Sequence, residues 1–384
     1  MTSPVLELIQ AALATVNDPE IRRPITELGM VDSVEIDEAG KVAVTVLLTV
    51  SGCPLKDTIT RDVTGAVEQV PGVTSVDLTL GVMTPEQRAG LQEVLRGGQT
   101  QKEILFSRPD SLTKVFAIAS GKGGVGKSTV TVNLAVAMAA QGMKVGIVDA
   151  DIYGHSVPSM LGVADVRPTQ VEDMIMPVPT TGGISVISIG MLKPRRDQVV
   201  AWRGPMLDRA LVQMLSDVYW GDLDALLLDL PPGTGDIAIS LGQHLPNAEV
   251  VVVTTPQEAA AEVAERAGTM ASMMNQRVVG VIENMSFLPC PHCGTEHRLE
   301  VFGSGGGARV ASTLSKRFGY DVPVLGEIPI DLELREGGDS GKPIVELAPE
   351  SVAAKELSKI AAVLSGRGRG LAGMQLGLTP AGRF

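Results

Sequence analysis

The sequence predicts a large α/β domain with a doubly wound, mostly parallel sheet, preceded by a small α+β domain. Three observations support this fold class. The chain of 384 residues is too long for one ordinary hydrophobic core. From residue 113 onward, short apolar runs alternate with helical patterns, as in parallel sheets that carry helices on both faces. Before residue 100, strands and helices follow a different order, and a polar, glycine-containing stretch separates the two regions.

The small domain is predicted over residues 1–96. Its expected elements are a helix at 3–16, strands at 31–36 and 42–50, a helix at 57–69 and a strand at 73–80. The first two strands flank the turn Glu38-Ala39-Gly40-Lys41, and the second strand is rich in β-branched residues. Residues 97–112 are expected to be a linker, because Gly97 to Gln101 offer few side chains for burial.

The large domain is predicted over residues 113–365. Its strands are expected at 115–119, 145–149, 184–189, 224–229, 249–254, 278–283 and 322–328. These runs are almost continuously apolar, which indicates strands buried on both faces. Ligands of such sheets bind at the carboxyl ends of the strands, where most candidate residues below lie. Residues 366–384 carry no recognisable motif and are predicted to be disordered.

A glycine-rich loop follows the first strand and fits the pattern G-x-x-x-x-G-K-[ST]. Its residues are Gly121, Lys122, Gly123, Gly124, Val125, Gly126, Lys127 and Ser128. A helical pattern begins at Thr129, and this strand–loop–helix context favours a phosphate loop over an ordinary glycine-rich turn. The glycines let backbone N–H groups converge on phosphate oxygens, and the helix N-terminus adds partial positive charge. Lys127 is expected to reach the β- and γ-phosphates and Ser128 to bind Mg²⁺, so the sequence predicts binding of ATP or GTP.

Aspartates lie at the ends of two further strands. Asp149 ends the strand at 145–149 and is followed by Asp151, while Asp229 ends the strand at 224–229. An apolar strand that ends in aspartate is typical of nucleotide hydrolases. We therefore expect Asp229 to hold Mg²⁺ through its water shell and Gly233 to offer its backbone N–H to the γ-phosphate. The alternative for Asp149 and Asp151 is that each caps the turn that follows.

Cys290 and Cys293 form a C-x-x-C pair near His292 and His297. Two thiolates at this spacing can face one metal centre. A local zinc site needs four ligands, for which the nearby histidines are the available extras. Two chains related by a two-fold axis would instead supply four thiolates, the complement of one [4Fe–4S] cluster. We favour this bridging cluster, with zinc and a redox dithiol as alternatives.

Charge and composition disfavour several classes of protein. The net charge is −12, and no dense cluster of lysines and arginines lies outside the extreme C-terminus, so we expect no nucleic-acid partner. The N-terminus shows no signal peptide, and no apolar run approaches the ~18 residues that span a bilayer, so we expect no membrane partner. Three cysteines cannot build a disulfide framework. We therefore expect a cytoplasmic protein.

Over residues 113–365 the chain resembles the Mrp-type iron–sulfur cluster carrier ATPases, within the MinD/ParA-like group that has a deviant Walker A motif. The motifs that carry the resemblance are K-G-G-V-G-K-S from Lys122, D-A-D-I-Y-G from Asp149, W-R-G-P from Trp202, D-L-P-P-G-T-G-D from Asp229, E-N-M-S from Glu283 and C-P-H-C from Cys290. Residues 1–96, with Asp18-Pro19-Glu20 and the segment 49–54, resemble the MIP18-type domain that is often fused to these carriers.

The resemblance implies an ATPase that works as a homodimer. Lys122 would reach across to the partner's phosphates, the alternative being a solvated loop lysine. Asp151 would position or activate the attacking water, Asp149 would support Mg²⁺ and the loop, and Asn284 would hydrogen-bond adenine. A [4Fe–4S] cluster would be received from an assembly scaffold and passed to apo iron–sulfur proteins. Cys53 is either a ligand during transfer or an ordinary buried cysteine.

Two other functions share the same loop. A MinD/ParA-like partitioning or positioning ATPase should carry a basic DNA-binding surface or a basic amphipathic helix at its C-terminus, and the sequence favours neither. A nitrogenase-reductase-like ATP-dependent electron donor also bridges a cluster across a dimer, but its cysteines lie far apart in sequence, whereas Cys290 and Cys293 are close. We therefore favour the carrier.

Overall fold

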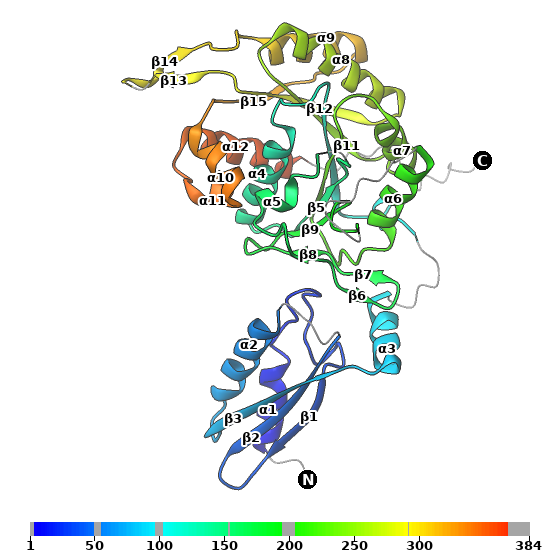
Figure 1. The fold of residues 1–384 in the computed structure, drawn as a ribbon, viewed down its shortest axis with the longest axis vertical. Coiled ribbons are helices and arrows are strands. Elements are labelled where there is room, and N and C mark those ends of the chain that lie inside the picture. Colours follow the sequence, from blue (N-terminus) through cyan, green and yellow to red (C-terminus); the bar gives the residue numbers. More distant parts are fainter. Residues whose placement is uncertain are drawn as a thin grey trace, which may run out of the picture. The chain divides into compact units, whose positions relative to one another are not determined.

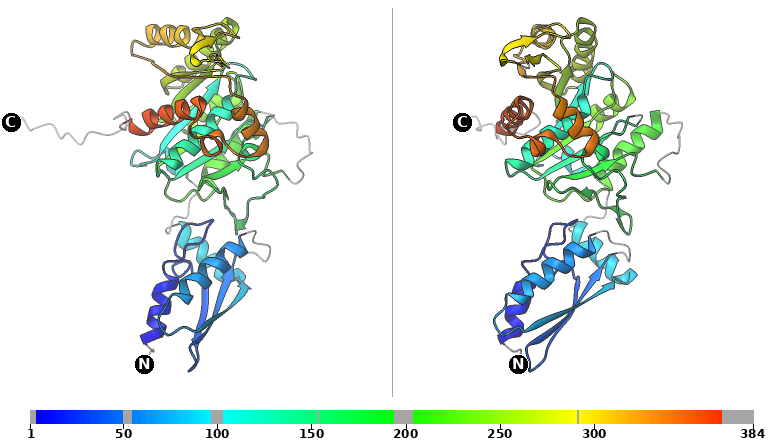
Figure 2. Two further views of the ribbon diagram at one scale, coloured as in Figure 1. Left: turned by 90° about the vertical axis from the view of Figure 1, so that its left-hand side faces the viewer. Right: turned by 60° about the vertical axis from the view of Figure 1, so that its left-hand side comes forward.

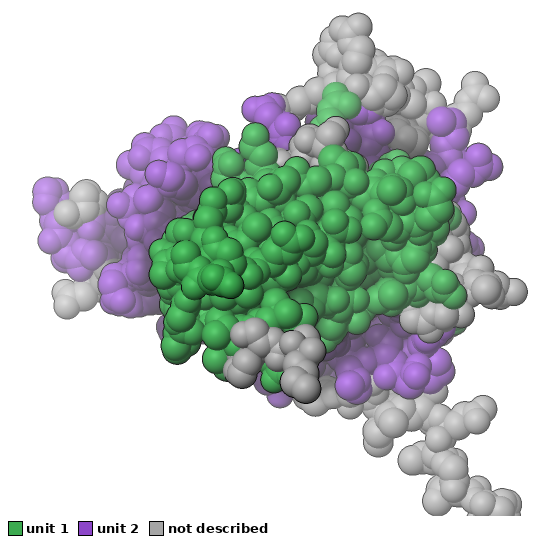
Figure 3. Space-filling view, turned by 90° about the horizontal axis from the view of Figure 1, so that it is seen from below, with its two compact units in different colours: residues 1–103, 167–179, 216–221 green, residues 104–166, 180–215, 222–384 purple. Residues whose placement is uncertain are grey.

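The computed structural model describes residues 4–49, 55–96, 103–152, 154–193, 204–290 and 292–367. Cys53, Trp202, Arg203 and the segment 368–384, which the sequence singled out, lie outside these ranges. The chain forms two compact units, which Figure 3 colours separately. Unit 1 holds residues 1–103, 167–179 and 216–221, and unit 2 holds residues 104–166, 180–215 and 222–384.

Unit 1 is a three-stranded sheet covered by helices (Figure 1). Its elements are α1 (Pro4–Leu13), β1 (Val31–Ile36), β2 (Lys41–Leu48), α2 (Lys56–Glu68), β3 (Ser75–Val82) and α3 (Pro85–Arg96). The central strand β2 pairs antiparallel with β1 and parallel with β3. Val42, Val44 and Val46 alternate with less buried residues along β2 and form one core with α1 and α2. The predicted α+β order is confirmed, and α3 is an addition that the sequence analysis did not expect.

The turn between β1 and β2 is fixed by Asp37. Its carboxylate accepts hydrogen bonds from the N–H groups of Ala39 and Lys41 at 2.9 and 2.8 Å. Gly40 has a φ of +79°, and a Cβ added there would overlap the carbonyl oxygen of Gly72. The sequence from Asp37 to Lys41 therefore sets the register of the two strands.

Two segments from the range predicted for the large domain lie in unit 1. The strands β6 (Gln170–Val171) and β7 (Met174–Ile175) form a short hairpin, and Val171 and Met176 are buried in the core of unit 1. Beside them, the Thr169 hydroxyl donates a hydrogen bond to the Glu20 carboxylate at 3.0 Å. The local sequence pattern could not assign this hairpin to one of the two domains, because the assignment depends on which hydrophobic core buries its apolar residues. The domain boundaries at residues 96 and 113 stay a prediction.

Unit 2 is built on the predicted, mostly parallel sheet. Its strand order is β15 (Val324–Ile328), β12 (Arg277–Asn284), β11 (Glu249–Thr254), β4 (Lys114–Ser120), β10 (Ala225–Asp229), β5 (Val145–Asp149) and β9 (Ser185–Ser188). The two-residue strand β8 (Val178–Pro179) belongs to the segment 167–179 of unit 1. The pairings from β15 through β9 are all parallel. β4 lies inside the sheet, between β11 and β10, and later strands of the chain are added on both of its sides. Ligands of such sheets are expected at this switch point.

Helices surround this sheet (Figures 1 and 2). A short 3₁₀ helix, η1 (Leu105–Ser107), precedes the sheet. The helices that follow are α4 (Lys127–Ala140), α5 (Val157–Met160), α6 (Gly204–Ser216), α7 (Asp236–His244), α8 (Glu258–Met273), α9 (Gly306–Phe318), α10 (Leu332–Ser340), α11 (Ile344–Leu347) and α12 (Val352–Gly366). α4 packs against α12, β5 and β10, while α8 packs against α9 and β11. α4 is buried almost all round, which explains why its sequence is apolar on every face.

Glu20 is expected to make the stability of unit 1 depend on pH. Burial, and then repulsion from the Asp18 carboxylate, raises the pKa of Glu20 from 4.5 to about 7. Because the folded pKa lies above the unfolded one, the stabilisation from protonated Glu20 is complete below pH 4.5 and is lost as the pH rises through about 7. Hydrogen exchange of β2 and α2, corrected for intrinsic rates, should therefore show less protection at pH 7.5 than at pH 5. Glu20→Gln should reduce this difference, and the exposed-carboxylate control Glu27→Gln should keep it. An unchanged pH dependence in Glu20→Gln would contradict this assignment.

Candidate functional site

The glycine-rich loop joins β4 to α4 and leaves the start of α4 open to a ligand. Gly124 and Gly126 have φ values of +81° and +80°, which L side chains rarely adopt. Gly126 is the N-cap residue of α4 and brings no side chain to cap the helix. The first backbone N–H groups of a 14-residue helix are therefore available to an anion, as in phosphate-binding loops.

Lys127 and Asp229 form a buried ion pair beneath this loop. Lys127 Nζ lies 2.7 Å from Asp229 Oδ1, and the two side chains are 6% and 0% exposed. Asp229 also accepts hydrogen bonds from the Ser128 hydroxyl at 2.6 Å and from the Thr131 hydroxyl at 2.8 Å. Asp151 Oδ2 lies 3.9 Å from the same Nζ. The structure thus brings four predicted residues together, and it adds Thr131. The signal for Thr131 was its position four residues after Lys127, on the same side of the helix.

Asp149 is as fully buried as Asp229. It accepts hydrogen bonds from the Ser188 hydroxyl at 3.1 Å and from the N–H of Asp151 at 3.2 Å. Burial, and then the neighbouring Asp229 carboxylate, raises the pKa of Asp149 well above its usual range. Asp151 in turn accepts a hydrogen bond from the N–H of Gly154 at 3.0 Å. Asp149 therefore holds the backbone of Asp151, whose own carboxylate lies 3.9 Å from Lys127 Nζ.

The oxygen donors of this site suit a magnesium ion. The Ser128 hydroxyl donates a hydrogen bond to the Asp229 carboxylate at 2.6 Å. The Asp151 carboxylate belongs to the same group, because it lies 3.9 Å from Lys127 Nζ. Hard oxygen donors of this kind, together with substrate phosphates and water, are what Mg²⁺ prefers. The residues present therefore fit the predicted ion.

Gly233 and Asn284 both contact the loop region. The Gly233 N–H donates to the carbonyl of Ser120 at 2.8 Å, and its φ is +92°. The Asn284 side-chain amide, 3% exposed, donates to the carbonyl of Val125 at 2.9 Å. Asn284 ends β12, so this hydrogen bond ties the loop to a neighbouring strand. The expected contacts of Gly233 with phosphate and of Asn284 with adenine stay predictions.

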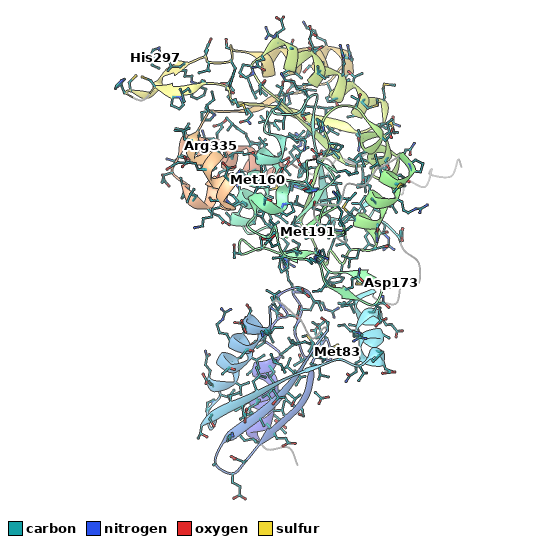
Figure 4. All side chains as sticks on the ribbon, in the orientation of Figure 1. Met83, Met160, Asp173, Met191, His297 and Arg335 are labelled. Carbon is teal, nitrogen blue, oxygen red and sulfur yellow. The ribbon has the colours of Figure 1, made fainter. Side chains whose placement is uncertain are left out.

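The cysteine pair lies on a separate hairpin of unit 2. Cys290 ends β13 (Leu288–Cys290), and Cys293 precedes β14 (Gly294–Leu299), which carries His297 (Figure 4). The ligand atoms of Cys290, Cys293 and His297 all lie within 4.8 Å of one another. His292, the other histidine considered from the sequence, is not part of this group.

The two thiols differ in acidity. The backbone N–H groups of His292 and Cys293 are the main cause that lowers the pKa of Cys290 to about 7. The hydrogen bond with Cys290 raises the pKa of Cys293. A thiolate is the form that binds metals, so Cys290 is the ligand already prepared near neutral pH. Cys293 is exposed and Cys290 is half-buried, so a metal held by the two thiols would be accessible from solvent.

Within the described ranges, every helix is too short or too polar to cross a bilayer.

Comparisons with known proteins show the family of each part of the chain. Residues 111–365 match a family described as NUBPL iron-transfer P-loop NTPase. Residues 6–78 match a family described as iron-sulfur cluster assembly protein. These matches confirm the resemblance drawn from the sequence motifs.

Individual relatives extend over nearly the whole chain. The iron-sulfur cluster carrier protein of Mycobacterium bovis is 58% identical, with 98% of this chain and 97% of that protein aligned. The protein of the same description from Deinococcus radiodurans is 43% identical, with 93% of each chain aligned. A solved structure, the nucleotide-binding protein from Archaeoglobus fulgidus in complex with ADP, is 39% identical with a TM-score of 0.53, covering 64% of this chain and 93% of that one.

Gly124 and Gly126 provide a matched test of the loop geometry. Both have positive φ, so alanine costs about 1 kcal/mol of backbone strain at either position. Only at Gly126 would the added Cβ also overlap the amide nitrogen of Asn284. We predict that Gly126→Ala weakens ATP binding roughly tenfold more than Gly124→Ala, measured by titration calorimetry.

A double variant isolates the cause. In an Asn284→Ala background, Gly126→Ala should cost less affinity than it does in the natural sequence, because the overlapping atom is gone. Equal losses for the two glycine variants, with no coupling to Asn284, would show that this packing does not shape the site.

Proposed function

We infer the function of this chain from its family, because the chain belongs to the NUBPL-type iron-transfer P-loop NTPases, which include the iron–sulfur cluster carrier proteins. We propose that it binds and slowly hydrolyses ATP with Mg²⁺, holds a [4Fe–4S] cluster between two copies of the chain, and passes the cluster to apo-proteins. The observation that carries the proposal is the presence, in one compact unit, of a phosphate loop with its acidic partners and an exposed thiol hairpin.

Nucleotide binding would rearrange the buried ion pair. In the structure, Lys127 is neutralised by Asp229, whose carboxylate also holds Ser128. Phosphate oxygens offer Lys127 a second anionic partner, which frees Asp229 and Ser128 to face a metal ion. Magnesium, when bound, would neutralise charge on the β- and γ-phosphates.

Asp151 is the residue that we assign to the attacking water. It is 8% exposed, whereas Asp149 and Asp229 are 0% exposed, and its backbone N–H donates a hydrogen bond to Asp149. Phosphoryl transfer needs little covalent help beyond an oriented nucleophile and charge stabilisation, so one held carboxylate is sufficient. Lys122 would add positive charge from the partner subunit at the phosphates.

The cluster assignment follows from ligand counting. Each chain presents two thiols on an exposed hairpin, and a two-fold axis doubles this number to four, which completes one [4Fe–4S] cluster. The cluster is the cargo of the carrier, received from an assembly scaffold and delivered to apo iron–sulfur proteins. The family match to iron transfer favours this function over a partitioning ATPase. Unit 1, which contains the assembly-protein match, is the part that we assign to delivery, and we place the protein in the cytoplasm.

The hydrolytic roles can be separated by two variants. Asp151→Asn keeps the size of the side chain and removes its charge. It should lower magnesium-dependent phosphate release about a hundredfold while ATP affinity changes little. Lys127→Ala should abolish turnover because it removes the only loop cation that faces the acidic pair in the described site. Asp222→Asn, at a highly exposed position, serves as the control. Full turnover in Asp151→Asn would contradict its role.

The cargo site can be tested by iron content after anaerobic reconstitution. Cys290→Ala and Cys293→Ala should each lose the cluster and the holo-dimer but retain ATP binding, because the contacts described for Lys127, Ser128 and Val125 of the phosphate loop involve neither cysteine. His297→Ala and Cys53→Ala should retain iron and acid-labile sulfide, since four thiolates are sufficient ligands. Loss of metal in His297→Ala, with zinc but no sulfide in the natural protein, would favour the local zinc alternative.

A further inference from the structure

The side chain of Lys122 is held by its own subunit. Lys122 Nζ donates a hydrogen bond to Gln257 Oε1 at 3.1 Å. Gln257 is the N-cap residue of α8, and its own side chain makes no cap of that helix. Gln257 is exposed, and Lys122 is half-buried. The Gln257 side-chain amide therefore accepts a hydrogen bond from Lys122 and does not cap helix α8.

The backbone of Lys122 is fixed to the same helix. A Cβ at Gly121 would overlap backbone atoms of Val263 and Ala264 in α8, so the loop approaches the helix as closely as a glycine allows. The Ser120 hydroxyl also donates to the carbonyl of Lys122 at 3.1 Å. With its backbone held in this way, Lys122 can change partner only by swinging its side chain.

The chemistry of the acceptor makes this contact reversible. An amide oxygen binds an ammonium group without a compensating charge, and an exposed contact of this kind is weak. Phosphate oxygens carry full negative charge and attract the same ammonium more strongly. A nucleotide presented by a second subunit would therefore outcompete Gln257, whereas a carboxylate at position 257 would compete far better.

We propose that Gln257 is a positioning residue for Lys122: it holds the lysine against its own subunit until a nucleotide-loaded partner takes it. This inference rests on the proposed role of Lys122 across the dimer. The hydrogen bond between Lys122 and Gln257 stabilises the monomer relative to the nucleotide-bound dimer. Its strength therefore affects the protein concentration at which the dimer forms and nucleotide turnover begins.

A charge series at position 257 tests the proposal. ATP turnover is measured against protein concentration for the natural chain, Gln257→Ala, Gln257→Met and Gln257→Glu, with Glu262→Ala on the exposed face of α8 as control. Removing the acceptor should lower the half-maximal protein concentration about threefold, and the carboxylate should raise it by a similar factor or more. ATP affinity of the dilute protein should stay the same in all of them.

Two outcomes separate this inference from the proposed function. If Lys122→Ala kept full turnover at every protein concentration, the role of the lysine across the dimer would fail. If Lys122→Ala were inactive but alanine and glutamate at position 257 shifted the half-maximal concentration in the same direction, or not at all, Gln257 would not position the lysine. In a Lys122→Ala background, the substitutions at position 257 should have no effect on dimer formation measured by light scattering.

Discussion

The nucleotide site depends on one buried ion pair, Lys127 with Asp229. Neither side chain has appreciable contact with water, so each charge must be paired, and removing one partner typically costs about 3–5 kcal/mol. The pair joins the first turn of α4 to the end of β10, and the hydroxyls of Ser128 and Thr131 complete the coordination of the carboxylate. The site is thus held together by the same groups that nucleotide and magnesium would have to recruit. Binding would exchange partners within an existing network rather than create one.

The parallel sheet places the remaining groups around this pair. The carboxyl ends of β4, β5, β10 and β12 meet at one edge, which brings Asp149, Asp229 and Asn284 to the loop although they are far apart in sequence.

Strand β12 also leads from the phosphate loop to the cysteine hairpin. Asn284 ends this strand with a hydrogen bond to the loop, and the chain then runs directly into the hairpin of Cys290. One strand therefore connects the nucleotide site to the candidate cargo site.

The sequence was sufficient for the sheet and for the residues that belong to local motifs. Apolar runs located the seven parallel strands from β15 through β9 in unit 2, although they did not predict the hairpin of β13 and β14. The spacing of glycines, lysine and serine located the loop, because these signals lie within a few neighbouring residues. It was not sufficient for partners that depend on tertiary folding. Ser188 beneath Asp149 and Gln257 beside Lys122 are ordinary polar residues in the sequence, and only the packing of β9 and α8 shows their contacts. The same limit applies to the hairpin at 170–175, whose apolar residues are buried in unit 1.

In the proposed function, two copies of a nucleotide-binding chain share one cluster. Native mass spectrometry of the anaerobically reconstituted protein tests it most directly, because it weighs chains and inorganic cargo in one complex. We expect a dimer that carries a single [4Fe–4S] cluster, and a monomer without cargo after cluster loss. A monomer that carries one metal ion of its own, or a dimer with one ion on each chain and no sulfide, would contradict it.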